Sequence, residues 1–437
     1  MFDTQTELSE PLKRNALDCC EAGSNRRDGS LIPLRNCEPS QLDVRSGYRR
    51  ERYRRRHVAQ MRDLRASRKA AGLDPNGSEG YAKPSRRFWC GKARAVGSVS
   101  VKVRQTESGP HAHFSGAQHC GSVWACPVCA PIIRRERADE VAEGMGRHVA
   151  AGGGAVFATF TVRHTASDSL ANVKRTLSDA YAGMARSRAF REWKDAEGFA
   201  GSITATEVTY GANGWHVHRH IVYLFEHAVS DAEALAMGDE LFGMWSHEVE
   251  RAGGRTVSRE AFDVRAIGRG TEDVARYVTK VSAGIEGLGR EVALSDVKRG
   301  RVAGSVAPFQ LLDVETPEAE ALWFEYVTAM KGTASLRWSR GLRDRLGMSH
   351  ERSDQEIVDE LERTGEVSAV VSRELFDLRL SRDHVSACRV LEAAERGDWR
   401  SVAEIVGGSP GSMVLPDGRG VPLFEATWVP ERAVFAA

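Results

Sequence analysis

Residues 202–225, SITATEVTYGANGWHVHRHIVYLF, decide the fold. Two runs with strand-like alternation flank the short segment from Gly211 to Gly214, and glycines at such a position are typical of a β-hairpin turn. If these residues form the turn, the pairing register places Glu207 directly opposite His218. We therefore predict an antiparallel hairpin with a chemically distinctive face.

That face carries three histidines. His216, His218 and His220 alternate along the second strand, so their imidazoles project from the same side of the sheet. Imidazole is the commonest metal ligand in proteins, and the pattern predicts a divalent metal site. Glu207 is expected beside it, either as a carboxylate ligand or as the group that orients a histidine. A register slip of one residue would instead make Glu207 a plain surface residue.

The elements around the hairpin indicate an α+β domain. Strands outnumber those that parallel βαβ units would give, so we expect an antiparallel sheet of about five strands with helices on one face. The flanking predictions are a helix from Pro131, a strand over 155–163, a helical region over 168–198, a helix over 231–251, a strand over 262–267 and a helix over 271–282.

Three motifs together resemble those of HUH-family endonucleases, especially rolling-circle plasmid replication initiators of actinobacteria and other Gram-positive bacteria. They are FATFTVRH (157–164), GWHVHRH (214–220) and EDVARYVTK (272–280). Similar segments extend the resemblance from about residue 90 to 347: CGSVWACPVC, PFQLL, LWFEYVTAMKG and LRWSRGLRDRLG.

The resemblance implies a five-stranded HUH-type sheet that holds Mg²⁺ or Mn²⁺ on the histidines, with Glu207 beside them. It implies that Tyr277 attacks the scissile phosphate, leaving a 5′-phosphotyrosine and a 3′-hydroxyl that primes replication. Lys280 lies on the same helical face as Tyr277 and would favour the phenolate. Relatives carry a glutamate four residues before the tyrosine to activate water; here that position holds Asp273, with Glu272 as the alternative.

A cysteine cluster precedes the histidine strand. Cys120, Cys126 and Cys129 have the close spacing of a structural zinc site. The resemblance implies Cys90 as the fourth ligand, because family members carry a similar upstream cysteine. The nearby histidines His111, His113 and His119 are the competitors.

Composition sets further bounds on the 437-residue chain. Its 41% apolar and 28% charged residues are ordinary for a globular protein, and no apolar run approaches the roughly 18 residues of a membrane span. The first fifteen residues include acidic side chains and lack an apolar core, so they do not resemble a signal peptide. We expect a cytoplasmic protein, whose eight cysteines then indicate metal binding before disulfides.

Basic residues gather in two places although the net charge is only +1. Residues 45–69 contain eleven Lys/Arg and two acidic residues, a pattern of either DNA contact or a solvated tail. A second basic run follows the cysteines and is either a phosphate-contacting or a solvated helix face. The candidate DNA contacts are Arg54, Arg55, Arg56, Arg134, Arg135 and Arg137.

These features predict four parts and one leading function. The parts are a basic flexible arm (1–85), a zinc-binding module with a basic helix (86–150), the HUH nickase domain (151–348) and a mostly helical region of unknown role (349–437). We expect a replication initiator that nicks single-stranded or hairpin DNA at a plasmid origin and works with a host helicase and DNA polymerase. The alternatives are an HUH-type transposase and a non-catalytic, zinc-dependent DNA-binding regulator.

Overall fold

The computed structural model describes residues 41–94, 97–106, 109–267, 305–407 and 409–425. The chain divides into two compact units, Met1–Val44 and Arg45–Ala437. Of the first unit only residues 41–44 are described, as the start of helix α1 (Gln41–Ala70). Among the described helices, none is both long enough and apolar enough to cross a bilayer.

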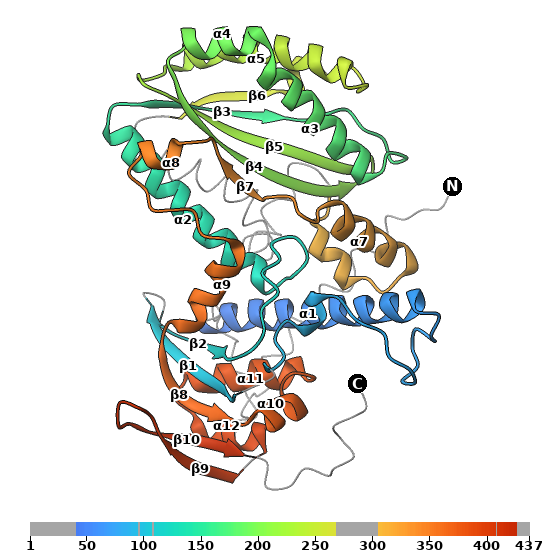
Figure 1. Cartoon of the computed structure of the whole chain (residues 1–437), viewed down its shortest axis with the longest axis vertical. Coiled ribbons are helices and arrows are strands. Elements are labelled where there is room, and N and C mark those ends of the chain that lie inside the picture. The colour runs from blue at the N-terminus through green and yellow to red at the C-terminus, as the bar shows by residue number, and fades with distance from the viewer. Residues whose placement is uncertain (1–40, 95–96, 107–108, 268–304, 408, 426–437) are drawn as a thin grey trace, which may run out of the picture. The chain divides into compact units, whose positions relative to one another are not determined.

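The histidine sheet, as we call the sheet that carries His216, His218 and His220, has five strands in the order β6-β3-β5-β4-β7 (Figure 1). All of its pairings are antiparallel, which confirms the predicted sheet. The strands are β3 (Gly154–Phe160), β4 (Phe199–Gly211), β5 (Gly214–Phe225), β6 (Asp263–Ile267) and β7 (Leu336–Trp338).

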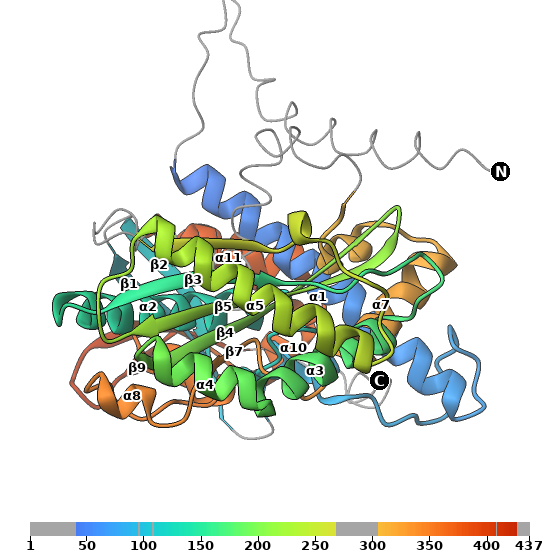
Figure 2. The same cartoon turned by 90° about the horizontal axis from the view of Figure 1, so that it is seen from above.

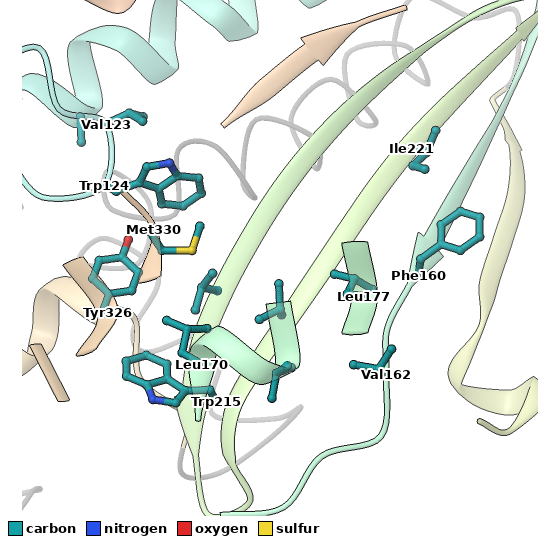
Figure 3. Close-up of a cluster of buried hydrophobic side chains, with 14 of the residues drawn as sticks. Val123, Trp124, Phe160, Val162, Leu170, Leu177, Trp215, Ile221, Tyr326 and Met330 are labelled. Carbon is teal, nitrogen blue, oxygen red and sulfur yellow. The ribbon is translucent and has the colours of Figure 1, made fainter. Parts of the chain in front are cut away.

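Three helices cover one face of this sheet: α3 (Leu170–Arg186), α4 (Arg188–Ala196) and α5 (Asp231–Arg251) (Figures 1 and 2). Serine caps begin each of them, and α5 starts with a complete capping box. Their apolar stripes bury side chains such as Leu177 against Phe160 and Ile221 of the strands (Figure 3). The same core continues to Trp215 and Tyr326, whose rings stack 6.0 Å apart.

The opposite face is also partly covered, so the expectation of helices on one face only was wrong. Helix α2 (Cys129–Ala150) packs Val141 and Met145 against Val222 and Leu224 of β5. The reason is that side chains of β5 alternate between the two faces of the sheet. The face that carries histidines at its start carries apolar side chains further on, and these require a cover.

A second sheet, β2-β1-β8-β10-β9, joins segments that are far apart in the sequence. Its strands are β1 (Val99–Thr106), β2 (Gly109–Ser115), β8 (Glu366–Val371), β9 (Ser409–Val414) and β10 (Gly420–Glu425). Val99 pairs with Val371, so the predicted boundary between the zinc module and a mostly helical end does not separate these segments. The described residues after 348 contain three strands as well as α9 (Asp354–Arg363), α10 (Arg373–Arg379), α11 (His384–Glu395) and α12 (Trp399–Val406).

Helix α1 corrects the expectation of a flexible arm over residues 1–85 from Gln41 onward. Five of its arginines are buried, and several arginines of the helix bind carboxylates of other elements: the buried ones are Arg49, Arg55, Arg56, Arg62 and Arg68. Arg49 donates to Glu395 of α11 (Nη1–Oε2 3.1 Å), and Arg55 donates to Asp313 (Nε–Oδ1 2.8 Å). A helix held by buried ion pairs has no apolar stripe, which is why its sequence resembled a solvated tail.

Short elements complete the described chain. They are the 3-10 turns η2 (Arg86–Trp89), η3 (Arg259–Ala261) and η5 (Pro308–Asp313), and the helices α7 (Pro317–Ala329) and α8 (Leu342–Arg345). Glu325 of α7 accepts hydrogen bonds from the indole of Trp215 (2.9 Å) and the backbone N–H of Leu170 (2.7 Å). This carboxylate ties α7 to the hairpin and to the start of α3.

Candidate functional site

The hairpin of β4 and β5 has the predicted register. Gly211 pairs with Gly214, and Glu207 pairs with His218. The three histidines therefore share one face of the central strand, and their rings lie almost parallel. The ring centroids of His216 and His218 are 4.0 Å apart, and those of His218 and His220 are 5.5 Å apart.

Glu207 is bound to a different histidine from the one it faces. Its Oε2 accepts a hydrogen bond from Nε2 of His220 at 3.0 Å, two pairs further along the ladder. The other ring nitrogen, Nδ1, lies 3.1 Å from the hydroxyl of Thr159 on β3. Both nitrogens of His220 thus have protein partners.

His164, in the loop after β3, sets the tautomer of His216. Its Nδ1 lies 2.8 Å from the carbonyl oxygen of Asn213, which only accepts hydrogen bonds, so Nδ1 of His164 carries the proton. Its Nε2 then accepts from Nδ1 of His216 at 2.9 Å. The lone pair of His216 consequently lies on Nε2, the form in which imidazole binds a metal. Sequence reasoning did not single out His164, although it ends the motif FATFTVRH.

Two ring nitrogens of the row are buried without a hydrogen-bond partner among the described residues: Nε2 of His216 and Nδ1 of His218. Burial, and then the neighbouring His164, lowers the pKa of His216 to about 4. Burial, and then His216, lowers the pKa of His218 to about 3. Both imidazoles are therefore neutral at pH 7. Neutral imidazole is the form of histidine that binds a divalent cation.

The helix predicted over 271–282 lies outside the described residues, and with it Tyr277, Asp273, Lys280 and Glu272. Tyr223, on β5 itself, is fully buried under the helices of the other face, 3.4 Å from the hydroxyl of Tyr181, and burial raises its pKa. It is no substitute nucleophile.

A second cluster consists of four buried cysteines: Cys90, Cys120, Cys126 and Cys129. The Sγ atom of Cys90 lies 3.5 Å from that of Cys126 and 3.7 Å from that of Cys129, and the Sγ atoms of Cys120 and Cys129 are 4.0 Å apart. Thiolates at about 2.3 Å around a tetrahedral zinc are separated by about 3.8 Å. Cys90 thus lies beside the other three cysteines, and the cluster fits a structural zinc ion.

The histidine competitors lie outside the four-sulfur group. His119 is the nearest, with Nδ1 3.9 Å from Sγ of Cys129 and Nε2 3.1 Å from Glu362. Burial opposes its protonation, but hydrogen bonds to Cys90 and Glu362 raise its pKa to about 9. A histidine between a carboxylate and a thiolate orients the ligand and does not replace it.

Helix α1 supports the cysteine cluster from outside. Gln60 donates to the backbone carbonyls of Phe88 and Cys90, both at 2.8 Å. Gly91 has φ +79°, and a Cβ there would overlap Nη1 of Arg56. The buried guanidinium of Arg56 therefore occupies the space that a side chain at position 91 would need.

Most of the arginines predicted to contact DNA have protein partners. Arg55 and Arg56 are buried, and Arg54 pairs with both Glu51 and Asp313. The arginines of helix α2, which follows the cysteines, differ in burial. Arg134 is buried and donates to the carbonyl of Val123 (3.3 Å), Arg137 is buried and bonds Glu140 (3.0 Å), and Arg135 is exposed.

Comparison with known proteins identifies the family. The chain is 30% identical to Protein rep of Streptomyces lividans over 323 residues, which cover 59% of this chain and 70% of that protein. It is 32% identical to Neomycin resistance protein of Streptomyces cyanogenus over 134 residues, which cover 25% of this chain and only 31% of that protein. No protein-family model and no solved structure matches the chain. The chain belongs to the family of actinobacterial plasmid Rep proteins, of which Protein rep of Streptomyces lividans is a member.

Proposed function

We propose that this protein initiates rolling-circle replication of a plasmid by nicking one DNA strand at the origin with an HUH-type, metal-dependent nickase domain. The observation that carries the proposal is the pair of neutral imidazole nitrogens on β5, Nε2 of His216 and Nδ1 of His218, which have no partner among the described residues. They lie on the central strand of an antiparallel sheet, in a chain of the plasmid Rep family.

The residues around the pair prepare it to hold Mg²⁺ or Mn²⁺. His164 keeps the lone pair of His216 on Nε2, and His220 orients Glu207 toward the same face. When bound, the divalent ion polarises the scissile phosphate as a Lewis acid. Because burial keeps both imidazoles unprotonated, no proton has to leave them before the ion binds at neutral pH.

The covalent step is assigned to Tyr277 on the basis of the family resemblance. Its phenolate oxygen attacks the phosphorus, the new bond is a 5′-phosphotyrosine, and the departing 3′-oxygen becomes the primer terminus. Lys280 favours the phenolate, and Asp273, or Glu272 beside it, activates the water that ends the reaction. The origin DNA is the partner at this site, and a host helicase and polymerase act on the nicked product.

Strand cleavage tests the proposal. Single-stranded oligonucleotides tiled across the DNA that flanks the gene are incubated with purified full-length protein and Mn²⁺. We expect one of them to be cut at a single position and one product to remain attached to protein. His218→Ala should lower the rate by at least a hundredfold, whereas His227→Ala, which removes an exposed histidine just past the end of β5, should leave it unchanged.

The outcomes separate the alternatives. Specific binding of the flanking DNA without any cleavage would favour a zinc-dependent regulator. Cleavage at the ends of a mobile element, and not at a plasmid origin, would favour a transposase. Equal rates for His218→Ala and His227→Ala would remove the histidine pair from the mechanism.

A further inference from the structure

The β1–β2 hairpin of the second sheet carries a row of cationic and imidazole side chains on one face. Lys102 pairs with His113, and Arg104 pairs with His111. Residues directly opposite each other in a ladder project from the same side of the sheet, and residues two apart share that side. The alternate positions, such as Val101 and Phe114, face the core with α10 and α11. The side of the hairpin that carries Lys102, Arg104, His111 and His113 is called the cationic face.

The polar atoms of this face lack partners to an unusual degree. Nε of Arg104, Nδ1 of His111 and both ring nitrogens of His113 are buried and form no hydrogen bond within the described residues. Among the described residues, Lys102 donates to a single group, the backbone carbonyl of Glu362, at 2.8 Å. In the part of the chain that the structure describes, neither Lys102 nor Arg104 forms a salt bridge, unlike the buried arginines of α1. Buried polar atoms left in this state cost free energy. All four residues are only half-buried, so the rest of each side chain remains accessible to a ligand.

The charges nearby select an anion. Two acidic side chains whose charge acts on the histidines of the face already have cationic partners. Glu395 is bound to Arg49, and Glu362 is bound to Arg94 (2.8 Å) and to His119 (3.1 Å). Although His111 and His113 resemble the histidine pair of β5, a divalent cation here would meet two uncompensated positive charges. A phosphate meets complementary charge and several hydrogen-bond donors.

An exposed positive charge of α2 lies near the face. Arg104 is only partly buried, and Arg135 lies close enough for its charge to lower the pKa of Arg104, after the larger effect of burial. Among the described residues Arg135 forms no salt bridge, whereas Arg137, two positions further on, is buried among carboxylates. A positively charged track that continues from one element to another suits a polymer of phosphates better than a single free ion.

We propose that the cationic face, formed by Lys102, Arg104, His111 and His113 with Arg135 at its rim, binds the phosphate backbone of duplex DNA. The inference rests on the proposed function in that origin DNA is the substrate, but it assigns a separate site on a separate sheet. Contacts of this kind position DNA without reading its sequence. The face would hold the duplex beside the origin while the histidine sheet acts on the single strand.

The test measures the affinity of the full-length protein for a fluorescein-labelled 20-base-pair duplex of arbitrary sequence, by anisotropy at several salt concentrations. Arg104→Gln should weaken binding about tenfold and make the slope of log affinity against log salt shallower by about 1. Arg188→Gln, which removes one exposed arginine of α4, is the matched control and should change neither value. His113→Phe, which removes an N–H donor without removing a permanent charge, should also weaken binding.

Zinc content and thermal melting verify that each variant is folded. The inference is overturned if Arg104→Gln and His113→Phe bind the duplex as Arg188→Gln does. It is also overturned if inorganic phosphate raises the melting temperature of the wild type but not of Arg104→Gln, while duplex binding is equal in both, since the face would then take free phosphate. Failure of the proposed function looks different: the wild type would bind the duplex through Arg104 but would cut no oligonucleotide.

Discussion

Nε2 of His164 accepts a hydrogen bond from Nδ1 of His216 at 2.9 Å, and this contact determines which nitrogen of His216 is available to a metal. Because the carbonyl of Asn213 holds the proton on the far side of His164, the two imidazoles form a directed chain. It starts at the hairpin turn and ends at the lone pair of His216. A loop residue therefore sets the chemistry of a strand residue.

Removal of His164 should weaken metal binding without unfolding the protein. His164→Ala leaves His216 free to adopt either tautomer, so we expect Mn²⁺ affinity to fall by about 10- to 100-fold, the range found for partners of metal ligands. Titration calorimetry with Mn²⁺ measures this directly. His227→Ala is the control and should bind like the wild type. An affinity for His164→Ala within twofold of the wild type would show that the hydrogen bond is incidental.

The cysteine cluster should hold one zinc ion per chain. Cys90→Ser removes a ligand, so elemental analysis should find zinc largely lost and the melting temperature lowered, because structural zinc contributes directly to folding. Cys388→Ser is a demanding control, since Cys388 is also a fully buried cysteine but lies outside the cluster. It should retain the zinc. Wild-type protein purified without chelators and free of zinc would refute the assignment.

Two glycines with similar backbones should differ in their tolerance of a side chain. Gly91 and Gly332 have φ of +79° and +74°, so alanine strains the backbone at both. A Cβ at 332 meets open space, whereas one at 91 meets the guanidinium of Arg56. We expect Gly332→Ala to lower the free energy of unfolding by about 1 kcal/mol and Gly91→Ala by about 2–4 kcal/mol. Equal losses in chemical denaturation would mean that Arg56 does not pack as described.

Acid should destabilise the protein partly through His113. Burial, and then the charge of Arg104, lowers the pKa of His113 to about 4, below its ordinary 6.5. As pH falls from 6.5 toward 4, His113 binds a proton in the unfolded chain but not in the folded chain. Stability is therefore lost over this pH range. In zinc-saturated, phosphate-free buffer, the loss between pH 7 and pH 5 should be smaller in His113→Gln, by about 1 kcal/mol. Identical losses in both proteins would exclude His113 as a contributor.

The sequence could predict contacts between segments that are close together in the chain. The register that pairs Glu207 with His218 follows from strand alternation and a four-residue turn, and the structure confirms it. The bond from Glu207 to His220 was not predictable, because side chains choose among diagonal neighbours only once packing is set. His164 was missed for the same reason, since its position opposite His216 depends on the path of a loop.

The remaining errors concern contacts between distant segments. Val99 and Val371 pair across most of the length of the chain, and no periodicity in either strand predicts this pairing. The arginines of α1 were expected to face solvent or DNA because charge normally does. Their carboxylate partners, such as Asp313 and Glu395, come from elements more than 250 residues away in the sequence. Only the fold brings the opposite charges together.

The most direct test of the central claim is the mass of the covalent product. A cleaved oligonucleotide should remain attached to the protein after denaturation, and digestion followed by mass spectrometry should place the 5′-phosphate on Tyr277. Tyr277→Phe should form no adduct while it still binds the same DNA. An adduct on another residue, or an adduct that persists in Tyr277→Phe, would contradict the assignment of the nucleophile. Cleavage without any adduct would contradict the nickase mechanism itself.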